Sequence, residues 1–212
     1  MIFILLTSTV VDAADAPPEL GDYVLNNSWG GEANVFNEPV DLAVGHDGRI
    51  YVLNRALSRV TIIKPGEEVY NTFGSFGYSQ GQFVNPTSIA IDEDGYVYVV
   101  GSWNVNIFTA DGVYSKTWGD FENASGIAIR DGFVYIVDSF EHCIYKLTLE
   151  GDSVLDEPWC GEGSGERQFN QPHDIAVDHD GYIYIADSGN NRIQKLSPTG
   201  EFVSEWGSEG SG

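Results

Sequence analysis

The sequence predicts an all-β fold in which four copies of a four-stranded antiparallel sheet are arranged as the blades of a β-propeller. An aromatic residue followed by Gly or Cys recurs at spacings of 44, 45, 41 and 47 residues. Each period contains one Asp-Gly pair, and an apolar residue follows its Gly by twelve residues in all four copies. Periods of about 40–50 residues with four strands are typical of propeller blades, whereas a β-sandwich shows no fixed period. The aromatic steps are Trp29-Gly30, Phe73-Gly74, Trp118-Gly119, Trp159-Cys160 and Trp206-Gly207, and the apolar residues are Val60, Ile107, Ile144 and Ile193.

The fourth copy shows most clearly how one unit divides into strands. Its alternating, β-branched and aromatic segments are separated by an Asp-Gly turn and by a Pro-Thr-Gly turn, which predicts a four-stranded meander. One apolar position in the first strand of each copy is expected to pack between blades. These positions are Leu42, Ile89, Ile127 and Ile175, the strands of the fourth copy are 174–177, 182–186, 192–196 and 202–206, and the blades span about 36–72, 73–117, 118–158 and 159–206.

The segment from Gln168 to Ile193 resembles an NHL repeat, through the run QFNQPHDIAV and the later run DGYIYIADSGNNRI. The resemblance extends over residues 22–212 and is weaker in the first three copies. It implies a propeller, usually six-bladed, that binds proteins, peptides, RNA or small molecules. The weaker copies have Asn54, Gly101 and Asp138 at the position of Asp187, and Arg59, Asn106 and Cys143 at the position of Arg192.

Four repeats are fewer than a six-bladed ring needs, so we expect an open arc. Tyr23 to Trp29 matches the outermost strand Phe202 to Trp206, which is the overlap that lets a propeller complete its last blade. An open arc leaves sheet edges and apolar faces unpaired at both ends. We therefore expect self-association through the open blades.

The N-terminal segment, residues 1–21, has the features of a secretory signal. Its apolar run from Ile2 to Val11 is too short to span a bilayer, and Ala14-Asp15-Ala16 follows as an Ala-x-Ala cleavage pattern. No Lys or Arg precedes the run, so an apolar tail without a targeting role is the alternative. No later segment is apolar enough to cross a membrane. The segment favours a secreted or extracytoplasmic location.

The charge balance argues against nucleic-acid partners. Ten Lys and Arg residues stand against 32 Asp and Glu residues, which gives a formal net charge of −22. Nucleic-acid affinity depends on cationic side chains that neutralise phosphates, so neither DNA nor RNA is an expected partner. An anionic membrane surface is excluded for the same reason. Cys143 and Cys160 allow one disulfide at most, and the sequence leaves open whether they pair.

The meander sorts the loops onto two faces. Connections between blades lie with the turns after each second strand, and the Asp-Gly turns lie opposite. The first face, with His142 and His173, is the candidate binding face for a protein, peptide or glycan, because aromatic residues occupy loops there that otherwise need polar residues and Gly. Packing of these rings between the blades is the alternative. His46 and His179 lie on the opposite face. The ligand-binding candidates are Trp103, Phe140, His173, Asp174, Asp187, Asn190 and Asn191.

An enzymatic role is the alternative. Amidating lyases that resemble this family cleave peptidyl-α-hydroxyglycine and hold zinc with histidines from several blades, so the resemblance implies His173 as a ligand. The equivalent positions here are Val40, Thr87 and Ser125, which cannot replace an imidazole. We therefore expect no catalytic residue and no cofactor, and a divalent metal only in this alternative. The Asp-x-Asp-Gly turns lack the ligand spacing of a calcium loop.

Overall fold

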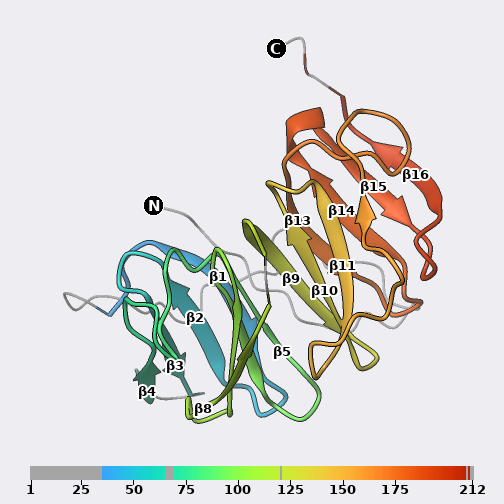
Figure 1. Ribbon diagram of the computed structural model, residues 1–212. Helices are drawn as coiled ribbons and strands as arrows, with labels where there is room; N and C mark the ends of the chain where they lie inside the picture. The colour runs from blue at the N-terminus through green and yellow to red at the C-terminus, as the bar shows by residue number, and fades with distance from the viewer. Residues whose placement is uncertain (1–34, 65–68, 120, 209, 211–212) are drawn as a thin grey trace, which may run out of the picture.

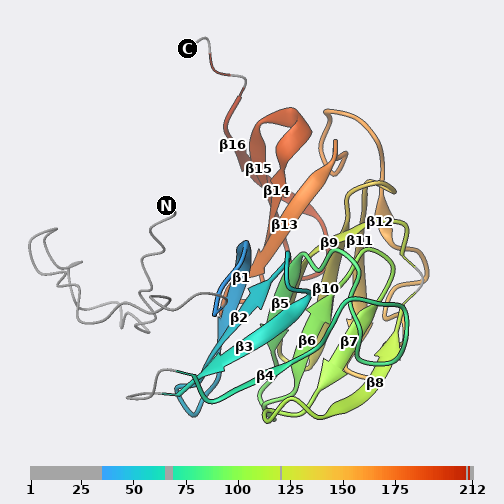
Figure 2. The ribbon, with the colours of Figure 1, turned by 90° about the vertical axis from the view of Figure 1, so that its left-hand side faces the viewer.

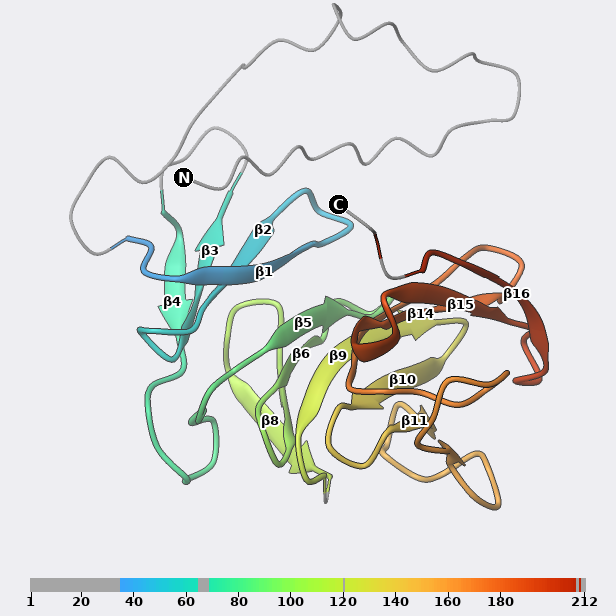
Figure 3. The same cartoon turned by 90° about the horizontal axis from the view of Figure 1, so that it is seen from above.

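The computed structural model describes residues 35–64, 69–119, 121–208 and 210. They form four antiparallel sheets of four strands each, ordered sequentially from the inner to the outer strand (Figure 1). The inner strands pack in the sequence β1, β5, β9 and β13. Seen from above, the sheets fan out with β4, β8 and β16 at the periphery (Figure 3). The predicted all-β arc of propeller blades is confirmed.

The strand bounds follow the repeat closely. The first sheet consists of β1 (Pro39–Val44), β2 (Ile50–Asn54), β3 (Arg59–Ile63) and β4 (Asn71–Phe73). The second consists of β5 (Ser88–Ile91), β6 (Val97–Val100), β7 (Val105–Phe108) and β8 (Tyr114–Trp118). The third consists of β9 (Ala124–Arg130), β10 (Phe133–Asp138), β11 (Cys143–Thr148) and β12 (Trp159–Cys160). The fourth consists of β13 (Pro172–Val177), β14 (Ile183–Asp187), β15 (Arg192–Leu196) and β16 (Phe202–Trp206), with a 3-10 turn at Ser188–Asn190.

Each Asp-Gly pair forms the hairpin between the first two strands of its sheet. Gly48, Gly95, Gly132 and Gly181 all have φ between 77° and 86°, a region that side chains disfavour. In the second sheet, Asp92 stands two residues before the Asp94-Gly95 pair. Its carboxylate accepts hydrogen bonds from the Tyr96 amide and the Tyr98 hydroxyl, at 2.8 and 3.0 Å. The Asp92 carboxylate therefore stabilises the turn in which it lies.

Figure 2 shows the four sheets as separate blades. The described residues form three hydrophobic clusters, one between each pair of successive sheets. In the second and third sheets one side faces the preceding blade and the other faces the next. Ile89, Ile127 and Ile175 are 4–6% exposed and pack toward the preceding sheet, as predicted, whereas Leu42 in the first sheet is only half-buried. Blade contacts and not single sheets therefore supply the burial that stabilises the fold.

A ring-on-glycine contact joins each blade to the next. Phe73 ends β4 and lies over Gly112, in the turn between the third and fourth strands of the next sheet. Trp118 lies over Gly151, and Trp159 over Gly200, in the same way. A Cβ atom on any of these glycines would come within 3.0 Å of the ring above it. The recurring aromatic residue is thus an inter-blade contact, which requires Gly on the other side.

Phe73 and Trp118 end β4 and β8, and Trp159 begins β12, so the first three sheets extend one or two residues beyond the predicted blade limits. In the described ranges, no helix has the length and apolar character needed to cross a bilayer. The signal-like segment and the expected strand from Tyr23 to Trp29 lie outside the described residues.

Candidate functional site

A pocket of about 690 Å³ opens on the inter-blade loop face between the third and fourth blades. It combines the two histidines that the sequence assigns to this face with the exposed ring of Phe140. Its walls come from the loops before β9 and β13 and from the turns that follow β10 and β14. The lining residues are Asn123, Ser139, Phe140, His142, Glu162, Gln171, His173 and Ser188.

Main-chain and hydroxyl contacts fix the pocket walls. The Gln171 amide donates to Nδ1 of His142 at 3.0 Å, so the neutral imidazole carries its proton on Nε2. The Ser139 hydroxyl donates to the Pro172 carbonyl at 2.5 Å, next to His173. At the positions equivalent to His173, Thr87 and Ser125 donate to carbonyls of the following blade. His173 occupies the equivalent position on β13, where it is exposed and lines the pocket.

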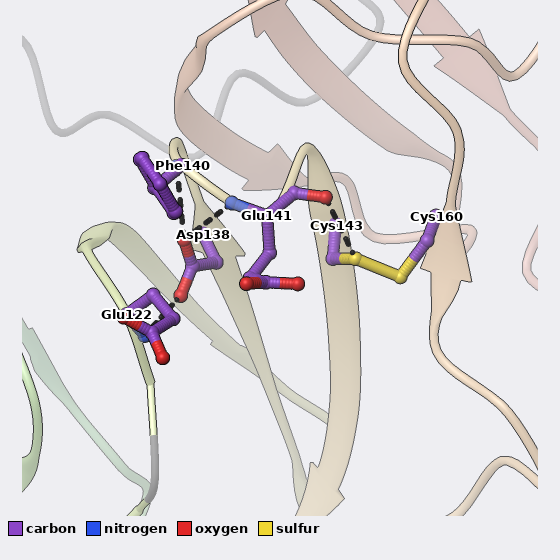
Figure 4. Close-up of a disulfide and its surroundings, with 6 residues drawn as sticks. All are labelled: Glu122, Asp138, Phe140, Glu141, Cys143 and Cys160. Carbon is purple, nitrogen blue, oxygen red and sulfur yellow. Dashed lines mark hydrogen bonds between the residues drawn. A yellow bond between two sulfur atoms is a disulfide. The ribbon is translucent and has the colours of Figure 1, made fainter.

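Two buried carboxylates shape the loops around the pocket. Asp138 is 0% exposed and accepts four backbone N–H groups, two from 122 and 123 before β9 and two from 140 and 141 in the turn beyond β10. Figure 4 shows those from Glu122, Phe140 and Glu141. It thereby positions Phe140. Asp187 is also 0% exposed and accepts hydrogen bonds from Asn170, Asn190, Arg192 and Gln194.

Asp187 therefore stabilises the loop that follows β14, through a buried carboxylate. Asn190 also donates to the Gly163 carbonyl at 2.8 Å. Asn191 is exposed in the left-handed conformation. Asp187 and Asn190 act on the loop, and Asn191 presents its side chain to solvent.

Cys143 and Cys160 form a disulfide across β11 and β12 (Figure 4). β12 contains only two residues, so few ladder hydrogen bonds hold this outer strand. The preceding residue His142 and the nearby Glu162 both line the pocket. The disulfide thus ties together the two segments that carry one side of the pocket, and it decides the pairing that the sequence left open.

The second blade adds a pair of exposed rings. Tyr78 and Trp103 stack with ring centroids 6.0 Å apart, and they are 78% and 47% exposed. Phe76 and Phe140 are 69% and 67% exposed. All four belong to inter-blade loops or to turns after second strands, so the rings lie on the surface instead of packing between blades.

Two family models match separate repeats of the chain. The NHL repeat matches residues 169–196, in the fourth blade, and the beta-propeller repeat matches residues 76–109, in the second. Both matches fall on four-stranded sheets that pack as blades. The chain is therefore similar to NHL and propeller-repeat proteins in these two blades. No curated protein matches it by sequence.

Solved structures similar to this NHL-type propeller include enzymes. A streptogramin B lyase has 13% identity and a TM-score of 0.64, over 83% of this chain and 56% of its own. A catalytically inactive virginiamycin B lyase from Staphylococcus aureus with quinupristin has 16% identity and a TM-score of 0.64, over 82% and 56%. A protein of unknown function from Bacteroides caccae has 17% identity and a TM-score of 0.62, over 84% and 69%. The chain spans 56% of the lyase chains, and at these identities the likeness shows the fold alone.

The NHL-type propeller brings some predicted site residues together and separates others. Phe140 and His173 share the pocket, whereas Trp103 belongs to the ring pair of the second blade and Asp174 lies on inner strand β13. Asn123, Ser139, Glu162, Gln171 and Ser188 were missed as lining residues. Each of these residues lies in or next to a loop that the sequence assigns to this face, and that position was the signal that could have identified them.

Among the described residues, no three His, Cys, Asp or Glu side chains are close enough to hold a metal ion. His46 lies with the Asp92 and Asp131 turns in a separate pocket of about 310 Å³, as the sorting of the two faces predicts. We therefore derive no metal-dependent step from either pocket.

Proposed function

We propose that this NHL-type propeller is a non-enzymatic binding scaffold whose inter-blade loop face takes a protein, peptide or glycan. The observation that carries the proposal is the pocket between the third and fourth blades, with Phe140 exposed at its wall. The exposed ring offers apolar contact area, and the polar groups around it can fix the orientation of a ligand.

The rigidity of the loops supports a recognition role. Four amides anchor Asp138, and the disulfide fixes the segment beside His142. Rings held by such contacts lose little conformational entropy on binding, so they suit the role of interface anchors. Because the chain has a formal net charge of −22, which repels phosphates, nucleic acid is not the proposed ligand.

Peptide and glycan arrays probed with the purified chain test the proposal. Phe140→Ala should abolish binding to the peptides or glycans that the unmodified chain retains. Tyr96→Ala is the matched control, because Tyr96 is 40% exposed in an Asp-Gly turn on the opposite face. Binding that survives Phe140→Ala but is lost in Tyr96→Ala would place recognition on the wrong face and reject the proposal.

A metal-dependent enzyme with His173 as a ligand is the second candidate. The observation in its favour is that His142 and His173 line the same pocket. Calorimetric titration with Zn²⁺ distinguishes the two functions. Stoichiometric binding that His173→Ala abolishes would favour the enzyme, and no heat of binding would favour the scaffold.

We also propose that the chain functions in a secreted or extracytoplasmic setting. The Cys143–Cys160 disulfide supports this location, since disulfides persist mainly in oxidising compartments. Mass spectrometry of the chain from its native source, before and after reduction, would measure the bridged fraction. A chain isolated with both thiols free would contradict the proposal.

A further inference from the structure

The pocket between the third and fourth blades carries negative charge without a compensating cation. Glu162 lines it, and no Lys or Arg is among its described lining residues. Glu122 and Glu141 lie in the two segments whose amides bind Asp138, and Figure 4 shows them grouped with Phe140 around that carboxylate. All three glutamates are exposed. The exposed ring of Phe140 therefore shares its loops and its pocket with three carboxylates.

These carboxylates have no cationic partner within the described part of the chain. Its ion pairs include none of the three glutamates. Arg192, which begins β15, is instead held by Asp187 and Glu205. Carboxylates gathered near one pocket repel each other and attract a cation from outside the chain. The pocket therefore suits a ligand that brings positive charge.

The ring of Phe140 also lacks a partner that other rings of this chain have. Nζ of Lys64 lies 3.1 Å from the ring centroid of Tyr70, and Nζ of Lys195 lies 4.0 Å from that of Tyr182. Among the described residues, no such contact includes Phe140. The face of an aromatic ring attracts a cation through its quadrupole, and a carboxylate in the same pocket adds a charge-assisted hydrogen bond.

The stacked ring pair of the second blade lies next to the loop that leads to the pocket. The amide of Phe121 donates to the Trp103 carbonyl at 3.3 Å, and the amide of Ala124 donates to the carbonyl before it at 3.1 Å. Asn123 belongs to this loop and lines the pocket. Exposed rings and the pocket thus follow one another along the loop face, which fits an extended chain better than a single small cation.

We propose that the pocket receives an Arg or Lys side chain of an extended basic peptide, with Phe140 against the cation and Glu162 as its counter-charge. This inference rests on the proposed binding function, and it narrows the ligand from a protein, peptide or glycan to a basic peptide segment. Amide and hydroxyl oxygens of the lining accept the remaining N–H groups of the cation, and they belong to Asn123, Gln171 and Ser188.

Two other classes of ligand match the charges less well. An acidic peptide would be repelled by Glu122, Glu141 and Glu162. A neutral glycan would stack on Phe140 and donate hydroxyl groups, but it would not neutralise the carboxylates. A basic peptide satisfies both the ring and the charge.

A positional-scanning library of short peptides with blocked ends, retained on the purified chain, tests the inference. The retained peptides should be enriched in Arg or Lys at one position, and a higher salt concentration should weaken their binding. Retained peptides without a cationic preference would overturn this inference and leave the proposed binding function standing. A chain that retains neutral glycans and no peptide would also overturn it, whereas a chain that retains neither would reject the proposed function as well.

Two single-charge variants locate the cation. Glu162→Gln should weaken binding of the tightest basic peptide about tenfold, because the charge-assisted contact is lost. It should not change the affinity of the same peptide with Gln in place of its Arg or Lys. Glu150→Gln removes the same charge from an exposed turn whose Leu149 lines the pocket on the opposite face, and it should leave both affinities unchanged. No loss in Glu162→Gln, or equal losses in the two variants, would overturn the inference.

Discussion

Nε of Arg192 donates a 2.8 Å hydrogen bond to the buried carboxylate of Asp187, five residues earlier in the same hairpin. The remaining guanidinium nitrogens donate to the carbonyls of Ser164, Gly165 and Gln168 and to Glu205. One side chain thus joins β15, the preceding inter-blade loop and the outer strand.

Arg192→Ala should destabilise the chain by about 3–5 kcal/mol, because it leaves the charge of Asp187 buried without its partner. Urea unfolding at neutral pH measures the change. Arg130→Ala is the control, since Arg130 pairs with the exposed Asp131 at 3.5 Å and such pairs contribute about 1 kcal/mol or less. Equal losses in the two variants would show that the buried pair has no special role.

Replacing both cysteines by Ser should lower the free energy of unfolding by about 3 kcal/mol, the value expected for a loop closed over a sequence separation of 17. Hydrogen exchange should rise in β12 more than in β8, whose five residues are held without a disulfide. Reductant should destabilise the unmodified chain and leave the double variant unchanged. A reductant effect on the double variant would trace the loss to another cause.

Ile175→Ala should cost about 2–5 kcal/mol, because its side chain is 5% exposed and fills the cluster between the third and fourth blades. The same substitution at Ile193, which is 39% exposed, should cost about 1 kcal/mol or less. Chemical denaturation of the two variants under one condition gives the comparison. A cost at Ile175 as small as at Ile193 would mean that the register of β13 is wrong.

Asp174→Asn should raise the free energy of unfolding relative to the unmodified chain, and this gain should be larger at neutral pH than at pH 4. Burial of the carboxylate raises the pKa of Asp174, the Ile175 amide opposes this, and the charge of Asp41 adds to the rise. Although the residue has open surface, its Oδ1 lies against the Gly126 backbone, which accounts for the desolvation.

Because the folded pKa lies above the ordinary value of 3.8, folding takes up a proton, and stability falls as pH rises from 3.8 through the folded pKa. The Asn variant avoids this loss, so its advantage in urea unfolding should grow with pH across that window. An advantage that shrinks as pH rises would contradict the assigned direction.

The repeat made the fold readable from sequence, because a twelve-residue interval kept in four copies fixes strand register and blade period together. The two faces followed from the same meander, so His142 and His173 could be placed on one side and His46 on the other. The disulfide could not be derived from the sequence. Cys143 and Cys160 are paired across β11 and β12, and the sequence does not give the register of a strand as short as β12. The pocket lining was only partly predictable, since Glu162 and Ser188 reach it through loop shapes that the buried Asp138 and Asp187 set.

The contact of each aromatic ring with the glycine of the following blade means that a repeat is not an independent module. Phe73 belongs to the first sheet and its glycine, Gly112, to the second, so the two sides of every such contact belong to different sheets although they fall in one sequence period. A sheet that is duplicated, lost or exchanged must therefore offer a turn glycine to the aromatic ring of the preceding sheet. Its own outer-strand ring must also fit the turn glycine of the sheet that follows. The unit that can be exchanged without a mismatch is staggered relative to the sheet, and it extends from one outer-strand ring to the glycine that receives it.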